Sequence, residues 1–216
     1  MKNKQLIYSL ITLFFFVIIS FFVFPEIFSG KDAYQPDIVN YKGGIKEVKD
    51  YLKSNNEESY WSNSMFGGMP TYLSGANYEN DWIKLLDRCL RLNLPSPADY
   101  LFLLLSGFFV LGFTLFKNWK YAALGSIFFS FSTYFFILVA AGHNSKLHSI
   151  TYFAPLVAGV ILIYQRKYFI GFLVYTIFLA LELESNHIQM TYYLLLSLIV
   201  FLFFEAIYSV KNSTIK

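Results

Sequence analysis

Residues 6–25 read LIYSLITLFFFVIISFFVFP, an almost wholly apolar run that ends at Phe24-Pro25. A helix needs about 20 apolar residues to cross a hydrocarbon layer roughly 30 Å thick. A secretory signal peptide would have a shorter apolar core followed by a small-residue cleavage site, and the sequence around Phe24 does not match that pattern. We therefore predict that residues 1–24 form an uncleaved first transmembrane helix.

A mostly polar stretch follows at residues 25–97, and apolar sequence then resumes. Of the 216 residues, 56% are hydrophobic and only 14% are charged, which is too apolar a balance for an ordinary soluble domain. Five further membrane helices are predicted at residues 98–116, 121–141, 150–164, 168–183 and 190–208. The expected fold is an all-α integral membrane protein, with a six-helix transmembrane bundle. Helices two to six occupy 98–208, and residues 209–216 form a cytoplasmic tail.

The basic residues predict the orientation of this bundle. They fall at alternate ends of the predicted helices, as Lys2 and Lys4, Lys117 and Lys120, Arg166 and Lys167, and Lys211 and Lys216. Because basic residues favour the cytoplasmic side, we expect the N-terminus in the cytoplasm and residues 25–97 as a large extracytoplasmic loop. The turns 142–149 and 184–189 then share that outer face. The net charge of +3 is dispersed, so we expect no nucleic-acid partner.

The large first loop contains two stretches with helical spacing of apolar residues, 45–53 and 82–92. Both are typical of amphipathic helices, which either lie on the membrane surface or pack on the bundle. Gly43-Gly44 is expected to begin the first of them. Between the two, residues 61–74 are rich in glycine, proline and aromatic residues, which predicts an ordered loop.

Two acids early in this loop, Asp32 and Asp37, are the candidate catalytic groups. Either could act as a general base or bind a divalent metal ion, although ordinary solvated loop charges would look the same. Asp37 is favoured because Pro36 fixes the backbone before it. Farther along, Trp61 and Tyr72 offer faces on which a sugar or a lipid could stack, unless this loop only packs on the membrane.

The turn at 142–149 carries His143, Asn144 and Lys146. Lys146 interrupts the positive-inside pattern, and with the histidine it could bind a phosphate or pyrophosphate; interfacial snorkelling is the alternative. Glu182 and Glu184 lie near the end of an apolar segment, where a charge needs a partner or a water-filled cavity. We expect Lys146 to be that partner.

The neighbouring residues Asn186, His187 and Gln189 complete a composite outward-facing site. His143 and His187 match no zinc-ligand spacing, so we assign no metal ligands.

Several strings together resemble the YfhO family of bacterial membrane proteins, in the branch typical of Bacteroidetes-like bacteria. They include Gln35-x-Asp37-Ile38, the string from Trp61 to Tyr72 (WSNSMFGGMPTY), Gly142-His143-Asn144-x-Lys146, and the string from Asn186 to Tyr193 (NHIQMTYY). That family is similar in architecture to GT-C glycosyltransferases, whose first outer loop carries an acidic residue and whose sugar donor is a polyprenyl phosphate.

The resemblance implies that Asp37 is the first-loop acid and that Lys146, His143 and His187 lie near the donor phosphate. Asn186 would line the same cavity. Members of that family are several times longer, so the chain is expected to be an N-terminal portion.

The function expected from this resemblance is the transfer of a sugar from a polyprenyl-phosphate donor to a cell-envelope glycan, lipid or protein on the extracytoplasmic face. A divalent metal ion stays open as a cofactor. The alternative is a non-catalytic membrane component for transport or assembly of lipid-linked envelope glycans. An ion or proton transporter is less favoured, because Glu182, Glu184 and Lys146 lie near helix ends and trace no path across the membrane.

Overall fold

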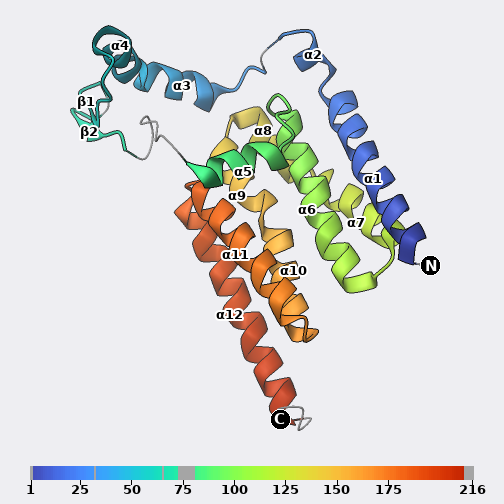
Figure 1. Ribbon diagram of the computed structural model, residues 1–216. Coiled ribbons are helices and arrows are strands. Elements are labelled where there is room, and N and C mark those ends of the chain that lie inside the picture. The colour runs from blue at the N-terminus through green and yellow to red at the C-terminus, as the bar shows by residue number, and fades with distance from the viewer. Residues whose placement is uncertain (1, 32, 65, 73–80, 212–216) are drawn as a thin grey trace.

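The computed structural model describes residues 2–31, 33–64, 66–72 and 81–211 and shows a helical bundle with an arm at one end (Figure 1). The bundle comprises α1 (Lys2–Val23), α6 (Ala98–Phe116), α7 (Trp119–Ser130), α8 (Thr133–Ala141), α9 (Asn144–Thr151), α10 (Phe153–Tyr164), α11 (Tyr168–Glu184) and α12 (Ile188–Lys211). Between α1 and α6 lie α2 (Pro25–Phe28), α3 (Pro36–Gly44), α4 (Lys46–Asn55), β1 (Trp61–Ser62), β2 (Met69–Pro70) and α5 (Trp82–Leu90). We call the described part of 36–72 the arm.

Within the described residues, four helical stretches are long and apolar enough to cross a membrane. They are Lys4–Val23, Ala98–Phe116, Asn144–Tyr164 and Ile188–Lys211. The pair α7 and α8 makes a fifth span if it crosses as one unit, although it bends by 48° at its break. The 17-residue α11 packs along α10 and falls at the short end of the range used by membrane helices. This architecture is compatible with an all-α membrane protein, whereas six crossings and a GT-C-like fold stay predictions.

Two of the predicted boundaries within the bundle are wrong. The expected single helix 121–141 is broken between Ser130 and Thr133. The expected turn 142–149 is mostly helical, because α9 begins at Asn144 and continues into α10 through Tyr152. Polar side chains in α9 therefore project from a helix and not from a flexible turn.

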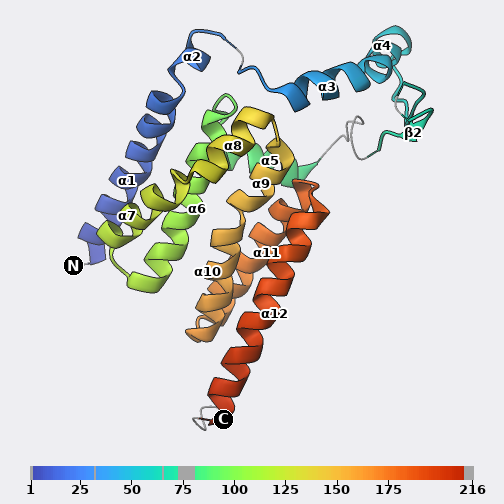
Figure 2. The same cartoon turned by 180° about the vertical axis from the view of Figure 1, so that it is seen from behind.

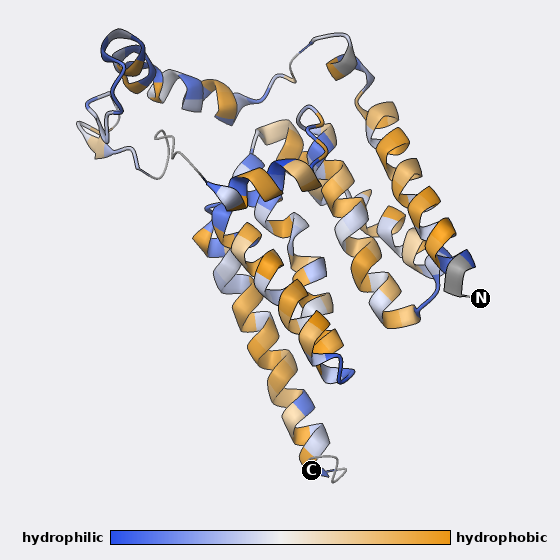
Figure 3. Ribbon diagram, in the orientation of Figure 1, coloured by the Kyte–Doolittle hydropathy of each residue, from blue (hydrophilic) through white to orange (hydrophobic). Residues whose placement is uncertain are grey.

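The two ends of the bundle differ in charge. The N-terminus, the turn after α6 and the turn after α10 all lie at the lower end in Figure 1, and Figure 2 shows the same grouping from behind. This basic end carries Lys4, Lys117, Lys120, Arg166 and Lys167. Lys117 and Arg166 have positive φ values of 53° and 61°, typical of residues that end a helix. The arm and α5 lie at the opposite end, which we call the arm end, where polar sequence is also concentrated (Figure 3).

Small residues allow the helices of the bundle to approach closely. A Cβ added to Gly159 of α10 would lie 2.7 Å from the backbone nitrogen of Tyr175, and one added to Gly171 of α11 would lie 2.7 Å from that of Ile163. Such close contacts are how membrane helices gain packing energy without a hydrophobic driving force between them. The α10–α11 pair is therefore a tightly packed unit despite the shortness of both helices.

The arm begins earlier than predicted. Its first helix starts at Pro36, a favoured residue at the first helical position, so Gly43 and Gly44 end α3 instead of starting a helix. Within the predicted loop 61–74, the described residues form an antiparallel hairpin that pairs Trp61 with Pro70; Met65, Leu73 and Ser74 lie outside the described residues.

Glu47 of α4 holds this hairpin in place. Its Oε2 accepts hydrogen bonds from Ser62 Oγ at 2.9 Å, from Asn63 N at 2.9 Å and from Ser64 N at 3.0 Å. Hydrogen bonds from the Ser62 and Asn63 side chains lower the pKa of Glu47. The hairpin is therefore tied to α4 by a single carboxylate.

Helix α5 packs on the bundle with several of its apolar side chains exposed. An amphipathic helix on the core of a soluble protein would bury them. Asp81 caps its N-terminus by accepting a hydrogen bond from Lys84 N at 2.9 Å. Trp82 and Leu85 are 76% and 51% exposed, whereas Asp87 is only 4% exposed. The exposed side of α5 is therefore largely apolar, whereas its inward side carries Asp87 between Ile83 and Leu90, which pack on the buried core.

Candidate functional site

The predicted catalytic acid Asp37 lies against the start of α9. Nδ1 of His143 is 2.9 Å from Oδ2 of Asp37, and both side chains are about half exposed, at 50% and 49%. Gly142 makes this approach possible. It ends α8 with a φ of 89°, and a Cβ there would lie 3.0 Å from Gln35 Cβ and 3.3 Å from Asp37 Cβ. The structure thus joins two candidate residues that are more than a hundred positions apart.

Gln35 fastens the beginning of the arm to the same turn. Its Nε2 donates to the carbonyl oxygen of Val139 at 2.6 Å, and its Oε1 accepts from Asn144 Nδ2 at 3.1 Å. The side chain is 7% exposed, so these bonds replace its contacts with water. Gln35 was missed as a site residue, although it belongs to the same short string as Asp37. The predicted cavity residue Asn144 lies next to the pair, through its hydrogen bond with Gln35.

Lys146 lies in the first turn of α9, one helical turn from His143. Its Nζ lies over the ring of Tyr134, 5.7 Å from the centroid, which is a cation–π contact. No carboxylate in the described part of the chain lies within ion-pair distance of it. The ammonium group is therefore held in place without being neutralised, which leaves its charge for an anion.

A second polar group, which the sequence analysis missed, is buried beneath α5. It consists of Asp87, Arg91, Asp99, His148 and Tyr152, and we call it the α5 cluster. Oδ1 of Asp87 accepts from the Tyr152 hydroxyl and lies 2.6 Å from His148 Nε2, while Oδ2 lies 3.2 Å from Arg91 Nη1. Nε of Arg91 donates to Asp99 Oδ2 at 2.8 Å. Through these bonds, α5, α6 and α9 meet at one point.

The charges in the α5 cluster stabilise one another. Burial alone would raise the pKa of Asp87, but the hydrogen bond and charge of His148, with help from Tyr152 and Arg91, lower this pKa to about 2. Burial alone would lower the pKa of Arg91, yet the neighbouring Asp99 raises it. A carboxylate and a guanidinium that are ionised and paired in this way compensate for each other's burial, so removing either one would leave a buried charge unpaired. Because every member already has a partner, we assign the cluster no reacting group.

The predicted pairing of Lys146 with Glu182 is wrong. The Glu182 side chain is fully buried, and its carboxylate accepts from Ser149 Oγ at 3.1 Å and from Thr191 Oγ1 at 2.8 Å. Ser185 Oγ lies 2.5 Å from Ser149 Oγ and extends the network. Hydroxyl groups thus satisfy this acid, because α9, α11 and α12 converge there.

The other predicted cavity residues are dispersed over the arm end. Glu184 lies beside Asp81 and Lys84 of α5. Nδ1 of His187 is buried and has no hydrogen-bond partner among the described residues. Asn186 adopts a φ of 57° in the turn between α11 and α12, and Gln189 donates to the Tyr193 hydroxyl at 2.8 Å.

The aromatic residues of the arm do not join Asp37. Trp61 lies in β1 and Tyr72 follows β2, and Figure 1 shows both strands beyond α4, away from the start of α3. Nε1 of Trp61 donates to Asn63 Oδ1 at 3.2 Å, and a Cβ on Gly68 would lie 2.7 Å from the Trp61 ring. Trp61 is therefore fixed by the hairpin itself.

Two other expectations concern Asp32 and a bound metal ion. The second candidate acid, Asp32, lies outside the described residues. Among the residues that are described, no group of three or more histidine, cysteine, aspartate or glutamate side chains could hold a metal ion. No family model, curated protein or solved structure matches the chain.

Proposed function

We propose that this chain belongs to a membrane glycosyltransferase of GT-C type that uses a polyprenyl-phosphate sugar donor on the extracytoplasmic face. Its acceptor is an envelope glycan, lipid or protein. The observation that carries the proposal is the contact of Asp37 with His143 at the arm end. A half-exposed carboxylate held by an imidazole, with an un-neutralised lysine one helical turn away, is suited to transferring a group from a phosphate.

The proposed topology has six crossings, with the basic end in the cytoplasm of a bacterial inner membrane. The grouping of Lys4, Lys117, Lys120, Arg166 and Lys167 at one end supports this orientation, because basic loops are retained on the cytoplasmic side. The arm, Asp37 and the start of α9 then face outward, where lipid-linked envelope precursors are used.

In the proposed reaction, Asp37 acts as the general base. Its Oδ1 has no hydrogen-bond partner within the described residues, while Oδ2 is oriented by His143. Oδ1 accepts the proton of the acceptor hydroxyl as the acceptor oxygen attacks the anomeric carbon. The bond between that carbon and the phosphate oxygen breaks, and polyprenyl phosphate leaves with the electron pair. Attack from the opposite face inverts the anomeric configuration.

Lys146 is the proposed partner of the departing phosphate. Negative charge grows on that group as the bond breaks, and a fixed cation stabilises it more in the transition state than in the bound donor. The first turn of α9 adds the positive end of a helix dipole at the same place. His143 and Lys146 therefore act from one short helix.

Two buried networks hold that helix in position. His148 joins α9 to Asp87 of α5, and Ser149 joins it to Glu182 of α11. These two adjacent residues contact different helices, so α9 is held on two sides. Support of this kind is what a site needs to keep its reacting groups in productive geometry.

The test is turnover of polyprenyl-phosphate sugars by membranes that contain the protein. We expect Asp37→Asn to remove turnover while the donor still binds, and Lys146→Ala to lower turnover more than it weakens donor binding. Asp50→Asn, an exposed acid on α4, is the matched control and should behave like the parent. Binding of lipid-linked glycan without turnover in the parent would overturn catalysis and support a non-catalytic role in transport or assembly.

A further inference from the structure

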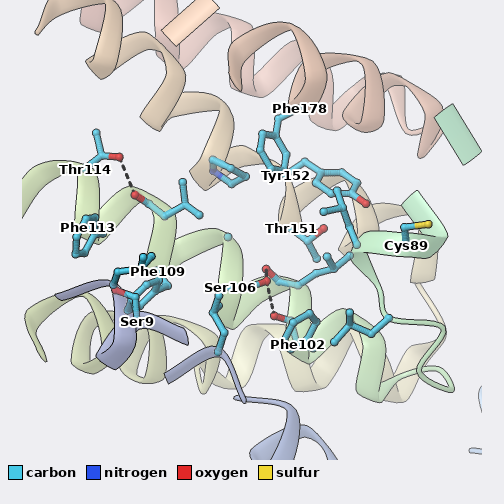
Figure 4. A pocket seen from close by; sticks show the side chains of 18 of the residues that line it. Ser9, Cys89, Phe102, Ser106, Phe109, Phe113, Thr114, Thr151, Tyr152 and Phe178 are labelled. Atoms are coloured by element: carbon cyan, nitrogen blue, oxygen red, sulfur yellow. Dashed lines mark hydrogen bonds between the residues drawn. The ribbon is translucent and has the colours of Figure 1, made fainter. Parts of the chain in front are cut away.

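A cavity of about 840 Å³ lies between α1 and α6 on one side and α5, α10 and α11 on the other (Figure 4). Its lining begins with Gln5 and Lys117 at the basic end and reaches Leu90 and Tyr152 beneath α5. Along α6 it runs from Phe102 to Thr114, about 18 Å at a rise of roughly 1.5 Å per residue. The cavity is therefore long and narrow and runs along the membrane-spanning direction.

Helices α1 and α10 both pack against α6 and leave this space between them. On one side, Gln5 Oε1 accepts from Trp119 N at 3.3 Å, and Tyr8 stacks on Trp119 with centroids 5.0 Å apart, so α1 is held against α7. On the other side, a Cβ on Gly107 would lie 2.7 Å from the carbonyl oxygen of Thr151, so α6 touches the end of α9. The walls are fixed by these contacts.

Three of the hydroxyl groups in the wall, those of Ser106, Thr114 and Thr151, are already hydrogen-bonded to the backbone. Ser106 Oγ donates to the Phe102 carbonyl at 2.8 Å and Thr114 Oγ1 to the Val110 carbonyl at 2.8 Å (Figure 4). Thr151 Oγ1 donates in the same way to the His148 carbonyl at 2.7 Å. A buried water needs two to four polar partners, and a wall in which most hydroxyl groups are already bonded offers few. The wall therefore favours a hydrocarbon occupant.

The charge of Lys117, at one end of the cavity, indicates which lipid head group would bind there. Lys117 lines the cavity directly after α6 ends, and it belongs to the basic end. Clusters of basic residues at a membrane surface attract anionic lipids. We propose that the cavity holds an acyl chain of an anionic phospholipid from the leaflet at the basic end, with the lipid phosphate at Lys117. This lipid is distinct from the proposed sugar donor, whose phosphate would lie at the arm end.

The acyl-chain site is tested with protein purified in mild detergent and supplied with phosphatidylglycerol, by native mass spectrometry. We expect the parent to retain one phosphatidylglycerol per chain and Val110→Trp, which fills the cavity, to retain at least tenfold less. Leu13→Trp on the α1 wall should lose the lipid as well. Val200→Trp on the exposed side of α12 is the control and should retain it. Unchanged retention in both folded cavity variants, checked by thermal melting, would overturn the proposal.

The head-group assignment is tested by charge reversal. Lys117→Glu should weaken retention of phosphatidylglycerol about tenfold, whereas Lys167→Glu, at the same end but outside the cavity lining, should have little effect. Equal retention of phosphatidylethanolamine by the parent would overturn the anionic head group. Tighter retention of polyprenyl phosphate that is indifferent to Lys117→Glu would assign the cavity to the sugar donor instead.

Discussion

Two carboxylate–histidine pairs are found at opposite ends of the short helix α9. Asp37 and His143 lie 2.9 Å apart with side chains about half exposed, while Asp87 and His148 lie 2.6 Å apart with side chains 6% and 12% exposed. The chemical groups are the same, and the surroundings differ. Water screens the first pair and leaves one carboxylate oxygen for a substrate, whereas the second is enclosed with Arg91 and Tyr152.

The difference indicates which pair is suited to the proposed reaction and which pair supports the fold. An exposed ion pair contributes about 0–1 kcal/mol to stability, so it can be rearranged by a substrate at little cost. Removing one member of a buried pair costs about 3–5 kcal/mol, because the remaining charge stays buried without its partner. We therefore expect substitutions at the two ends of α9 to separate activity from stability.

The largest expected effect is on Arg91. Arg91→Ala leaves Asp87 and Asp99 buried together without the guanidinium that bridges them, and should destabilise the bundle by about 3–5 kcal/mol. Thermal unfolding in detergent measures this loss. Arg88→Ala on the same helix removes an exposed arginine and should change stability by less than about 0.5 kcal/mol. Equal effects of the two substitutions would contradict a structural role for the α5 cluster.

The next effect concerns pH and Asp87. Because the folded-state pKa of Asp87 is lowered to about 2, its contribution is fully present above the ordinary pKa near 4 and is lost as the pH falls toward 2. Asp87→Asn should therefore cost about 2 kcal/mol at pH 7, and the difference from the parent should shrink across that window. Unfolding curves at several pH values measure it. A difference that stays constant down to pH 2 would show that the charge of Asp87 is not the cause.

At the exposed end of α9, His143→Ala should reduce turnover with little change in stability. Loss of the group that orients Asp37 is expected to lower the rate by roughly tenfold to a hundredfold, less than the full 10²–10⁴ of general-base catalysis. Turnover and melting temperature are measured together, with Ser145→Ala as the control on the same helical turn. If His143→Ala lowers the melting temperature and leaves turnover unchanged, the roles assigned to the two pairs are wrong.

A smaller effect is expected at Gly142, which brings the arm to α9. Gly142→Ala forces a side chain into a φ of 89° and against Gln35, at a cost of about 1–2 kcal/mol. The arm should shift and turnover should fall. Gly43→Ala is the matched control, since a Cβ there meets nothing within 4 Å. If both variants keep parental turnover, the position of the arm does not control the reaction.

The smallest effect is local to the hairpin of the arm. Glu47→Gln weakens the carboxylate that accepts from Asn63 and Ser64, so hydrogen exchange at those two amides should become faster. Because the pKa of Glu47 is lowered, the parent hairpin should itself loosen as acid protonates this group, and the variant should lack that dependence. Exchange elsewhere in the bundle should be unchanged. Faster exchange throughout α6 would mean that the hairpin supports more than the arm.

The sequence pointed to individual candidate residues, but it did not predict which residues they contact. Asp37 stood out because Pro36 fixes the backbone before it, and Lys146, beside His143, because it interrupts the positive-inside pattern. The pairing of Glu182 with Lys146 was wrong, because the hydroxyls of Ser149 and Thr191 reach the carboxylate first. Asp87 was overlooked because, in the sequence, it lies on the polar side of a helix whose orientation on the bundle is unknown.

By itself the sequence determined that the chain is helical and suited to a membrane, since hydrocarbon thickness and backbone hydrogen bonding constrain each apolar segment separately. It also determined which end of each segment is basic. Tertiary structure alone decided that α5 turns Asp87 inward, that the start of α3 reaches Gly142, and that a cavity separates α1 from α10. These features depend on contacts between segments distant in the chain, and their energies arise only when both surfaces are in place.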